Sequence, residues 1–279
     1  SERLEIGGIP FVSISVKPTR NEALEYYRRA TLSNHLNVHL QEEVKSINGR
    51  DGNYEVITTK TTYHTKYIVL ATGFYDRPVL MNIPGEDLPK VTHYYKEPHF
   101  YAMQKVVVVG ANNSAVDAAL ETFRKGAEVT MVIRGGEIGK RVKYWVKPDM
   151  EKRITEGSVK AFFNSTLAAI YEDRVDVQTP DGIVTIPNDY VIATTGYQPQ
   201  FDFLRKTGIH LSDDEKLRPD YNPETMETNK KNIYLAGVVC GGMDTHSWFI
   251  ENSRVHATMI MKDILRKENQ MKHQNLKSK

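Results

Sequence analysis

The sequence predicts an α/β protein with two Rossmann-like, three-layer dinucleotide-binding domains, each with a β-meander and one inserted in the other. Two observations lead to this fold class. Residues 106–109 are an unbroken run of valines that leads through a glycine into a helical pattern. A meander of short strands occurs twice, and each time a buried strand ending near Thr-Gly follows it. Uninterrupted β-branched runs are typical of parallel strands that are covered on both faces.

Residues 105–141 contain the strongest indication of a nucleotide site. A strand at 106–109 ends in a glycine-led turn at 110–115, which opens directly into a helix, and a second strand follows at 127–133. Gly126 stands where a glycine commonly ends a helix. A strand, turn, helix and strand within about 30 residues is the context that a dinucleotide fingerprint requires.

The turn departs from the G-x-G-x-x-G fingerprint at two positions. Asn112 replaces the second glycine and Ala115 replaces the third. Alanine is an accepted third residue, and asparagine tolerates left-handed backbone angles better than most residues. Backbone N–H groups at the start of the helix still point toward a pyrophosphate. The predicted contacts are Gly110, Asn112, Asn113, Ser114 and Ala115.

The end of the second strand indicates which nucleotide binds. An NAD site places Asp or Glu there for the ribose 2′-hydroxyl, whereas this strand ends in Arg134, with Lys140 and Arg141 close behind. Cations suit a 2′-phosphate, so the sequence predicts NADPH. Gly196, after a strand at 189–194, is predicted to line the nicotinamide side. The alternative is a plain βαβ unit with a solvated basic loop.

Composition limits the location and the partners. The chain of 279 residues has a formal net charge of +2, which shows no bias toward nucleic acid or an anionic membrane. No apolar run approaches about 18 residues, and the first residues lack a basic-then-apolar signal region. The single cysteine, Cys240, excludes an internal disulfide, a C-x-x-C pair and a multi-cysteine zinc site within this sequence. We therefore expect a cytoplasmic protein without a metal.

The predicted domain organisation is discontinuous. Residues 1–98 and 199–279 form one domain, and residues 99–198 form the inserted one. The chain starts at Ser1 rather than Met, and about 20 residues precede its first predicted helix. A βαβ nucleotide unit needs about 30 residues, so we expect a fragment that lacks the N-terminal βαβ unit of the first domain.

In the first domain a helix is predicted at 21–33, with Thr19 as its cap. Its predicted buried side chains are Leu24, Tyr27 and Ala30 or Thr31. The predicted strands are 37–40, 43–48, 54–59, 61–70 and 232–236. The last helix is predicted at 246–267, and the tail at 268–279 is expected to be disordered.

In the second domain a helix is predicted at 147–156, with Pro148 in its first turn. The predicted meander strands are 158–163, 167–172, 174–178 and 183–186.

Several segments of the sequence resemble those of a known family. Four segments resemble those of the two-dinucleotide-binding-domain flavoproteins. They are V-V-V-V-G at 106–110, Y-I-V-L-A-T-G at 67–73, Y-V-I-A-T-T-G-Y at 190–197 and N-I-Y-L-A-G-V at 232–238. Four further segments are similar to those of one group of these flavoproteins, the thioredoxin-reductase-like bacillithiol disulfide reductases. They are H-Y-Y-K-E-P-H at 93–99, N-N-S-A-V-D-A-A at 112–119, K-Y-W-V-K-P-D at 143–149 and T-H-S-W-F-I-E-N at 245–252. The resemblance covers essentially the whole chain.

The resemblance implies two cofactors and a direction of electron flow. FAD would bind the interrupted domain and NADPH the inserted one, and electrons would pass from NADPH through FAD to bacillithiol disulfide. A small-molecule disulfide and a second copy of the chain are the implied partners, with no nucleic acid and no membrane. The chain lacks the family's N-terminal FAD glycine motif with its adjacent cysteine, and it has Gly237-Val238 where many relatives have Gly-Asp.

The flavin contacts are predicted at the carboxyl ends of parallel strands, where open α/β sheets bind ligands. They are Val44, Thr72, Gly73, Gly237, Val238, His246 and Ser247. His246 and Ser247 are expected to open the last helix, whose N-terminus would stabilise negative charge on the flavin while His246 relays a proton. The alternative for His246 is a half-exposed helix cap.

Cys240 is the one thiol of this sequence that could exchange with a disulfide. The N-terminus of a nearby helix would favour its thiolate, whereas the alternative is a small core residue. Two other functions remain open: a flavin-dependent monooxygenase, although residues 91–96 lack the F-x-G-x-x-x-H pattern of those enzymes, and a nucleotide-binding protein without turnover. The absence of a C-x-x-C pair argues against a thioredoxin reductase proper.

Overall fold

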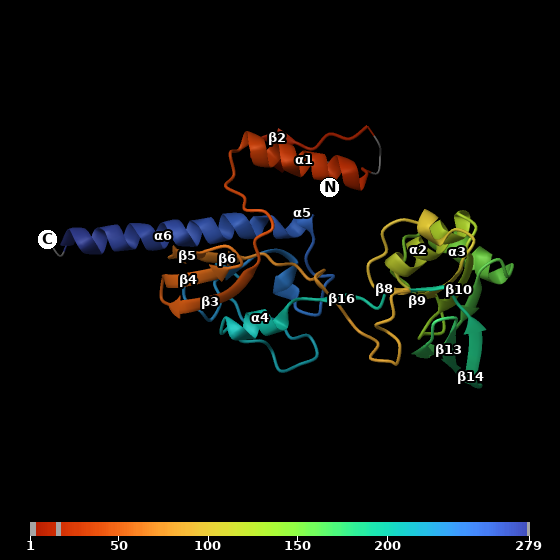
Figure 1. Ribbon diagram of the computed structural model, residues 1–279. Helices are drawn as coiled ribbons and strands as arrows, with labels where there is room; N and C mark the ends of the chain where they lie inside the picture. Colours follow the sequence, from red (N-terminus) through yellow and green to blue (C-terminus); the bar gives the residue numbers. More distant parts are fainter. Residues whose placement is uncertain (1–3, 15–17, 278–279) are drawn as a thin grey trace. The chain divides into compact units, whose positions relative to one another are not determined.

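The computed structural model describes residues 4–14 and 18–277, and the chain divides into two compact units. Unit 1 comprises Ser1–Arg77 and Gln198–Lys279, and unit 2 comprises Pro78–Tyr197 (Figure 1). The chain leaves unit 1 once and returns once. Unit 2 is therefore inserted in unit 1, as the sequence predicts.

The first boundary between the units differs from the prediction. It lies at 77/78 rather than 98/99, because β8 (Val91–Thr92) pairs in parallel with β15 (Tyr190–Ala193) and so belongs to the sheet of unit 2. A two-residue strand is too short to show a recognisable periodicity in the sequence. The second boundary lies at 197/198, one residue before the predicted 198/199.

Unit 2 is built on a five-stranded parallel sheet with the order β11-β10-β9-β15-β8. In it β9 (Lys105–Val109) lies beside β10 (Glu128–Val132). The strand predicted at 158–163 as part of a meander is instead β11 (Lys160–Phe162), which pairs in parallel with β10. Parallel neighbours need a crossover connection, and α3 (Lys147–Thr155) lies on the path from β10 to β11.

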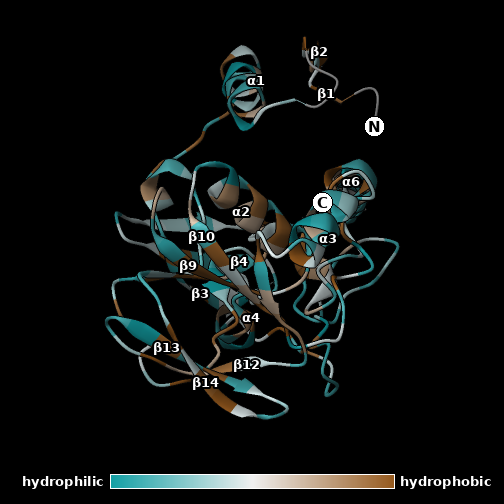
Figure 2. Cartoon of the chain, turned by 90° about the vertical axis from the view of Figure 1, so that its right-hand side faces the viewer, coloured by the Kyte–Doolittle hydropathy of each residue, from teal (hydrophilic) through white to brown (hydrophobic). Residues whose placement is uncertain are grey.

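Alternate residues of β9 face two different layers. Val106 and Val108 pack in one apolar cluster with side chains of α2 (Asn113–Arg124), whereas Val107 packs in another with a three-stranded antiparallel meander. Figure 2 shows α2 on one side of β9 and β10 and the meander on the other. The predicted three layers are confirmed. The meander strands are β12 (Thr166–Ile170), β13 (Arg174–Thr179) and β14 (Gly182–Pro187).

Unit 1 has a smaller parallel core. β6 (Ile68–Leu70) pairs in parallel with β17 (Ile233–Leu235), and the apolar cluster around them includes side chains of α4 (Phe201–Lys206) and α6 (Val255–Lys277). The meander of this unit comprises β3 (Val44–Arg50), β4 (Asn53–Thr58) and β5 (Thr62–Thr65). The remaining short elements of the chain are β1 (Glu5–Ile6), β2 (Ile9–Pro10), β7 (Arg77–Pro78), β16 (Tyr197–Gln198), the 3₁₀ turns η1 (His99–Tyr101) and η2 (Gly237–Gly241), and α5 (Ile250–Ser253).

The helix α1 (Arg20–Ser33) begins at the predicted Thr19 cap. Thr19 Oγ1 accepts a hydrogen bond from the N–H of Glu22, and the Glu22 carboxylate accepts one from the N–H of Thr19 at 2.7 Å. This reciprocal pair is a capping box, which satisfies two backbone donors that have no partner within the helix.

Three local expectations for unit 1 are wrong. Tyr26 is buried in α1 in place of Leu24 and Tyr27. Its ring packs against Phe11, with centroids 5.0 Å apart, and its hydroxyl donates to the carbonyl of Ile9 at 2.8 Å. Residues 37–40 form no strand, since the first ladder of the meander begins at Val44. The strand predicted at 61–70 is two strands, β5 and β6, because the chain passes there from the meander to the parallel pair.

The last helix begins and ends later than predicted. Two helices, α5 and α6, replace the single helix predicted at 246–267, and α6 continues through 268–277, which the sequence predicts to be disordered. Residues 278–279 of that predicted tail lie outside the described residues. Glu268 explains part of this length, because its Oε1 accepts hydrogen bonds from Lys66 Nζ and Tyr67 OH, both at 2.7 Å.

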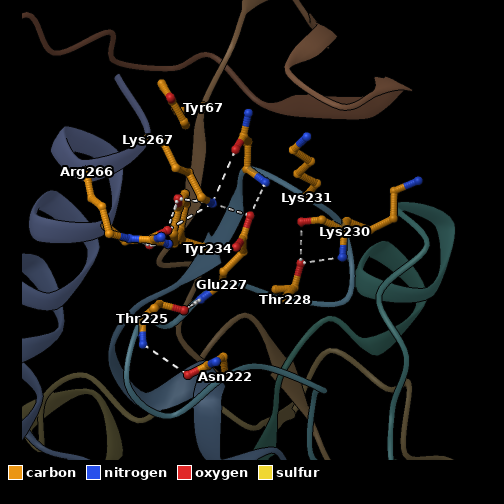
Figure 3. A network of polar contacts seen from close by, with 12 residues as sticks. Tyr67, Asn222, Thr225, Glu227, Thr228, Lys230, Lys231, Tyr234, Arg266 and Lys267 are labelled. Carbon is orange, nitrogen blue, oxygen red and sulfur yellow. Dashed lines mark hydrogen bonds and ion pairs between the residues drawn. The ribbon is translucent and has the colours of Figure 1, made fainter. Parts of the chain in front are cut away.

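A network of polar contacts attaches α6 to β17 and the loop before it. Figure 3 shows Lys267 between Glu227 and Tyr234. Its Nζ donates to Glu227 Oε1 at 2.5 Å and to Tyr234 OH at 2.9 Å. Asp263, only 3% exposed, accepts from Tyr234 OH at 2.8 Å and from Arg266 at 2.5 Å. Partners distant in sequence therefore stabilise this helix.

Candidate functional site

A cavity of about 540 Å³ opens in unit 2 at the carboxyl ends of β9, β10 and β15. This is the edge at which open α/β sheets bind ligands, and the volume is typical of small-molecule sites. All of its lining residues belong to unit 2. They come from within the segments 79–83, 109–112, 132–135, 165–167 and 194–195.

Gly110 follows β9 and lines this cavity. Its φ is +126°, and a Cβ at this position would lie 2.6 Å from Thr194 Oγ1 and 3.0 Å from the Thr194 carbonyl oxygen. Thr194 is itself fixed, because its Oγ1 donates to the carbonyl of Val109 at 2.6 Å. Only glycine fits this position, and the missing side chain lets a ligand approach the backbone closely.

Asn112 also lines the cavity, for a reason other than the predicted one. Its φ of −93° and ψ of −172° are extended, so the tolerance of asparagine for left-handed angles plays no part here. Asn112 is the N-cap of α2, and its side chain makes no capping hydrogen bond. The first N–H groups of the helix therefore remain available to an anion.

The three predicted cations lie at different distances from the cavity. Arg134 lines it, at the carboxyl end of β10. Lys140 and Arg141 are exposed outside the lining, and Lys140 Nζ lies 3.7 Å from Glu137 Oε1. The structure thus brings Gly110, Asn112 and Arg134 together.

The other predicted nucleotide contacts do not line the cavity. Ala115 is buried in the core of unit 2, and Ser114 is exposed on the first turn of α2. The Asn113 side chain bonds to the backbone of residues 141 and 143. Gly196 follows Thr195, which does line the cavity. The Gly196 carbonyl accepts a hydrogen bond from the N–H of Val79 at 2.9 Å.

Sequence reasoning missed one wall of the cavity, the segment from Val79 to Ile83. Glu86 shapes this wall, since its carboxylate accepts from the N–H groups of Met81 at 2.8 Å and Asn82 at 2.7 Å. His93 Nε2 lies 3.2 Å from the same carboxylate. The sequence around Glu86 indicates only a turn, and its acidic side chain directly after Pro-Gly is the one feature that could have pointed to this role.

In unit 1 the strand ends predicted to contact flavin do come together. Leu70 of β6 and Leu235 of β17 are in register, so Thr72-Gly73 and Gly237-Val238 follow at the same edge. The φ angles of Gly73 and Gly237 are +71° and +79°, and a Cβ at either position meets no atom within 4 Å. Backbone is therefore accessible at this edge.

Val44 lies elsewhere in unit 1, at the start of β3. It lines a hollow of about 270 Å³ together with Glu42 and Tyr63. Glu42 accepts hydrogen bonds from Thr58 Oγ1 at 2.6 Å and from Tyr63 OH at 3.0 Å, and the bond from Thr58 in particular lowers the pKa of this carboxyl group.

The predicted placement of His246 and Ser247 at a helix N-terminus is wrong. Both are exposed in a turn, and α5 begins only at Ile250. Ser247 Oγ donates instead to Asp244 Oδ2 at 2.7 Å. A helix macrodipole acts within its first turn, so it does not act on His246 here.

Cys240 has the environment of a core residue. It is 1% exposed within η2, and burial raises the pKa of its thiol to about 12. A thiolate is the nucleophile in disulfide exchange, and this environment strongly disfavours it. The prediction of a reactive thiol at this position is therefore wrong, and the alternative of a small core residue holds.

His256 is a buried polar residue that sequence reasoning missed. It is 1% exposed, and its Nδ1 accepts a hydrogen bond from the N–H of Gly237 at 3.1 Å. Burial lowers the pKa of His256, so the ring is neutral near pH 7 and Nε2 bears its proton. The Trp248 ring lies edge-on to it, with centroids 4.5 Å apart. His256 thus fixes the backbone turn that follows β17.

Two kinds of site are absent from residues 4–14 and 18–277. No three His, Cys, Asp or Glu side chains gather there in a way that could bind a metal ion. None of the helices in these residues combines the length and the apolar character needed to cross a bilayer.

Both units contain parallel strands, and in unit 2 a glycine turn opens into a helix beside a basic residue. This arrangement defines a two-domain dinucleotide-binding oxidoreductase fold. A family model described as pyridine nucleotide-disulphide oxidoreductase matches residues 1–237. The chain belongs to this family.

The chain is similar to bacillithiol-linked reductases over most of its length. It is 42% identical over 271 residues to bacilliredoxin reductase Bdr of Bacillus subtilis (strain 168). The matched residues cover 96% of this chain and 83% of the relative. The solved structure of bacillithiol disulfide reductase Bdr (YpdA) from Bacillus cereus matches with a TM-score of 0.91 and 40% identity, over 94% of this chain and 82% of that one. The enzyme of the same name from Staphylococcus aureus matches with the same TM-score and coverage at 39% identity.

These findings confirm the resemblance and the class of activity. The protein is an oxidoreductase of a family that uses FAD and NAD(P)H. A flavin monooxygenase from Stenotrophomonas maltophilia also matches, with a TM-score of 0.69 over 92% of this chain and 80% of that one. At 19% identity that match shows a shared fold alone.

Proposed function

We propose that this protein reduces bacillithiol disulfide with electrons from NADPH, with NADPH bound by unit 2 and FAD by unit 1. The observation that supports this most directly is Arg134 beside the Gly110 turn in the cavity of unit 2. The names of the relatives indicate the substrate, which is bacillithiol disulfide or bacilliredoxin.

The residues of unit 2 fit NADPH. Gly110 leaves space for the pyrophosphate at the start of α2, whose first N–H groups have no cap from Asn112. Arg134 supplies a cation for the 2′-phosphate. The segment around Val79 and Thr195 closes the other side of the cavity, where the nicotinamide would lie.

The residues of unit 1 fit one edge of a flavin site. The ends of β6 and β17 present Gly73 and Gly237 with no side chain over the backbone, and His256 holds the second of these turns in place. When bound, FAD would accept a hydride from NADPH and pass the electrons on to a disulfide. Because Cys240 is buried, we propose that the disulfide does not exchange with it.

The setting of this activity follows from its substrate. Disulfides of low-molecular-weight thiols are reduced in the cytosol, so we place the enzyme in the cytoplasm. We propose that it works on a small molecule as a homo-oligomer, without nucleic acid or a membrane.

An absorbance experiment tests the function. The purified chain, supplied with FAD, is titrated anaerobically with NADPH and then with bacillithiol disulfide. We expect NADPH to bleach the flavin band and bacillithiol disulfide to restore it, with cystine as a control that restores it more slowly. If cystine restored the flavin band as fast as bacillithiol disulfide does, the proposal that bacillithiol disulfide is the substrate would be contradicted. Binding of NADPH without any bound flavin would support the second candidate, a nucleotide-binding protein without turnover.

A further inference from the structure

The loop at 134–143 of unit 2, called here the basic loop, contains all three predicted cations. Arg134, Lys140 and Arg141 are exposed along it. Its apolar side chains point the other way, since Ile138 and Val142 are buried in the same cluster as α2. The loop is thus packed against α2 while its cations face solvent.

The Asn113 side chain joins the basic loop to the first turn of α2. Its Nδ2 donates to the carbonyl of Arg141 at 3.1 Å, and its Oδ1 accepts from the N–H of Lys143 at 2.9 Å. A primary amide offers a donor and an acceptor on two separate atoms, whereas an ionised Asp offers only acceptors and a Ser hydroxyl offers both on a single atom. Both polar groups of the Asn113 side chain are therefore engaged with the loop.

A second contact lies on the other side of the loop. The N–H of Gly139 donates to the carbonyl of Ala111 at 2.9 Å. A Cβ at Gly139 would lie 2.4 Å from Asn112 Oδ1 and 2.9 Å from the Ala111 carbonyl oxygen. Only glycine allows the loop backbone to lie this close to the nucleotide turn.

We propose that Asn113 is a positioning residue that sets the preference for NADPH over NADH by holding the basic loop against the start of α2. A loop that is ordered before binding loses little further conformational freedom when a ligand arrives, and this favours affinity. The 2′-phosphate of NADPH would gain from ordered cations at this place, whereas NADH has no such group. The inference rests on the proposed function, in which unit 2 binds NADPH.

Calorimetric titration of the full chain with NADPH and with NADH tests the inference without any turnover. Asn113→Ala removes both hydrogen bonds. We expect the Kd for NADPH to rise about fivefold to tenfold, the size expected from one to two neutral hydrogen bonds, and the Kd for NADH to stay within about twofold. Circular dichroism melts verify that each variant is folded, and Asn113→Ser is used if Asn113→Ala is not.

Asp117→Asn is the matched control. It breaks the ion pair between Asp117 Oδ2 and Lys143 Nζ at 2.7 Å, which also links α2 to the loop but is partly exposed to solvent. Exposed pairs contribute little, so both Kd values should remain within about twofold. Equal losses for NADPH and NADH in Asn113→Ala would overturn the inference by indicating a contact with the shared pyrophosphate. Unchanged values for both nucleotides would overturn it as well. If the parent chain itself showed no preference for NADPH, the proposed function would fail instead.

Discussion

Unit 2 and unit 1 differ in how much parallel sheet they contain. Unit 2 has five parallel strands between helices and a meander, whereas the described residues of unit 1 have a two-stranded parallel pair. Apolar clusters cover both faces of the larger sheet. In unit 1 the polar network around Asp263 and Lys267 supplements one apolar cluster. The comparison indicates that a short parallel core relies more on long-range polar contacts to attach its helices.

The largest expected effect tests this reliance in unit 1. Asp263→Ala removes the buried carboxylate that Tyr234 and Lys267 contact at 2.8 and 2.9 Å. Removing one partner of a buried pair costs about 3–5 kcal/mol, so the free energy of unfolding in urea should fall by about that much. Glu268→Gln, on the same helix but only half-buried, should lower the free energy of unfolding clearly less. Equal costs for the two variants would contradict the special role of the buried network.

The next effect concerns the cavity of unit 2. Arg134→Ala should weaken NADPH binding by about 1.5–3 kcal/mol, the usual loss for a charge-assisted hydrogen bond, and should hardly change NADH binding. Fluorescence titration with both nucleotides measures this. Lys125→Ala, at an exposed cation near the far end of α2, serves as the control and should leave both unchanged. If NADPH and NADH weakened equally, Arg134 would not select the phosphate.

A third test asks whether the glycine turn of unit 2 tolerates a side chain. Gly110→Ala places a Cβ 2.6 Å from Thr194 Oγ1, and the resulting overpacking should cost about 1–3 kcal/mol in thermal unfolding and abolish nucleotide binding. Gly126→Ala is the matched control, because its φ is also positive, at +88°, but no atom lies within 4 Å of the added Cβ. It should cost about 1–2 kcal/mol in backbone strain and leave binding intact. Retained binding in Gly110→Ala would show that the turn can rearrange.

The smallest expected effect is a pH dependence in unit 1. Burial lowers the pKa of His256, so between its folded pKa and about 6.5 the unfolded chain takes up a proton that the folded chain does not. Stability from this residue is therefore fully present above about pH 6.5 and is lost as the pH falls below that value. His256→Asn keeps an acceptor for the N–H of Gly237. It should reduce the dependence of the free energy of unfolding on pH, measured by urea titrations between pH 5 and 8. His64→Asn, at an exposed position, serves as the control.

The sequence by itself determined the features whose partners are close along the chain. The capping box of Thr19 with Glu22 spans three residues, and the turn from β9 into α2 is complete by the first helical residue, Asn113. The parallel strand at 106–109 is recognisable because both of its faces are apolar. Arg134 could be placed at the site because the second strand of a nucleotide unit always ends at the same edge.

Only the tertiary structure decided the features that depend on residues far apart. Cys240 is buried by side chains from several elements, and no local pattern distinguishes that setting from an exposed one. His256 reaches Gly237 across 19 positions, and β8 joins a sheet whose partner strand lies about a hundred residues later. The length of α6 is decided in the same way, through Lys66 and Tyr67. Burial and pairing over such separations depend on the packed chain as a whole, so helix and strand periodicity does not reveal them.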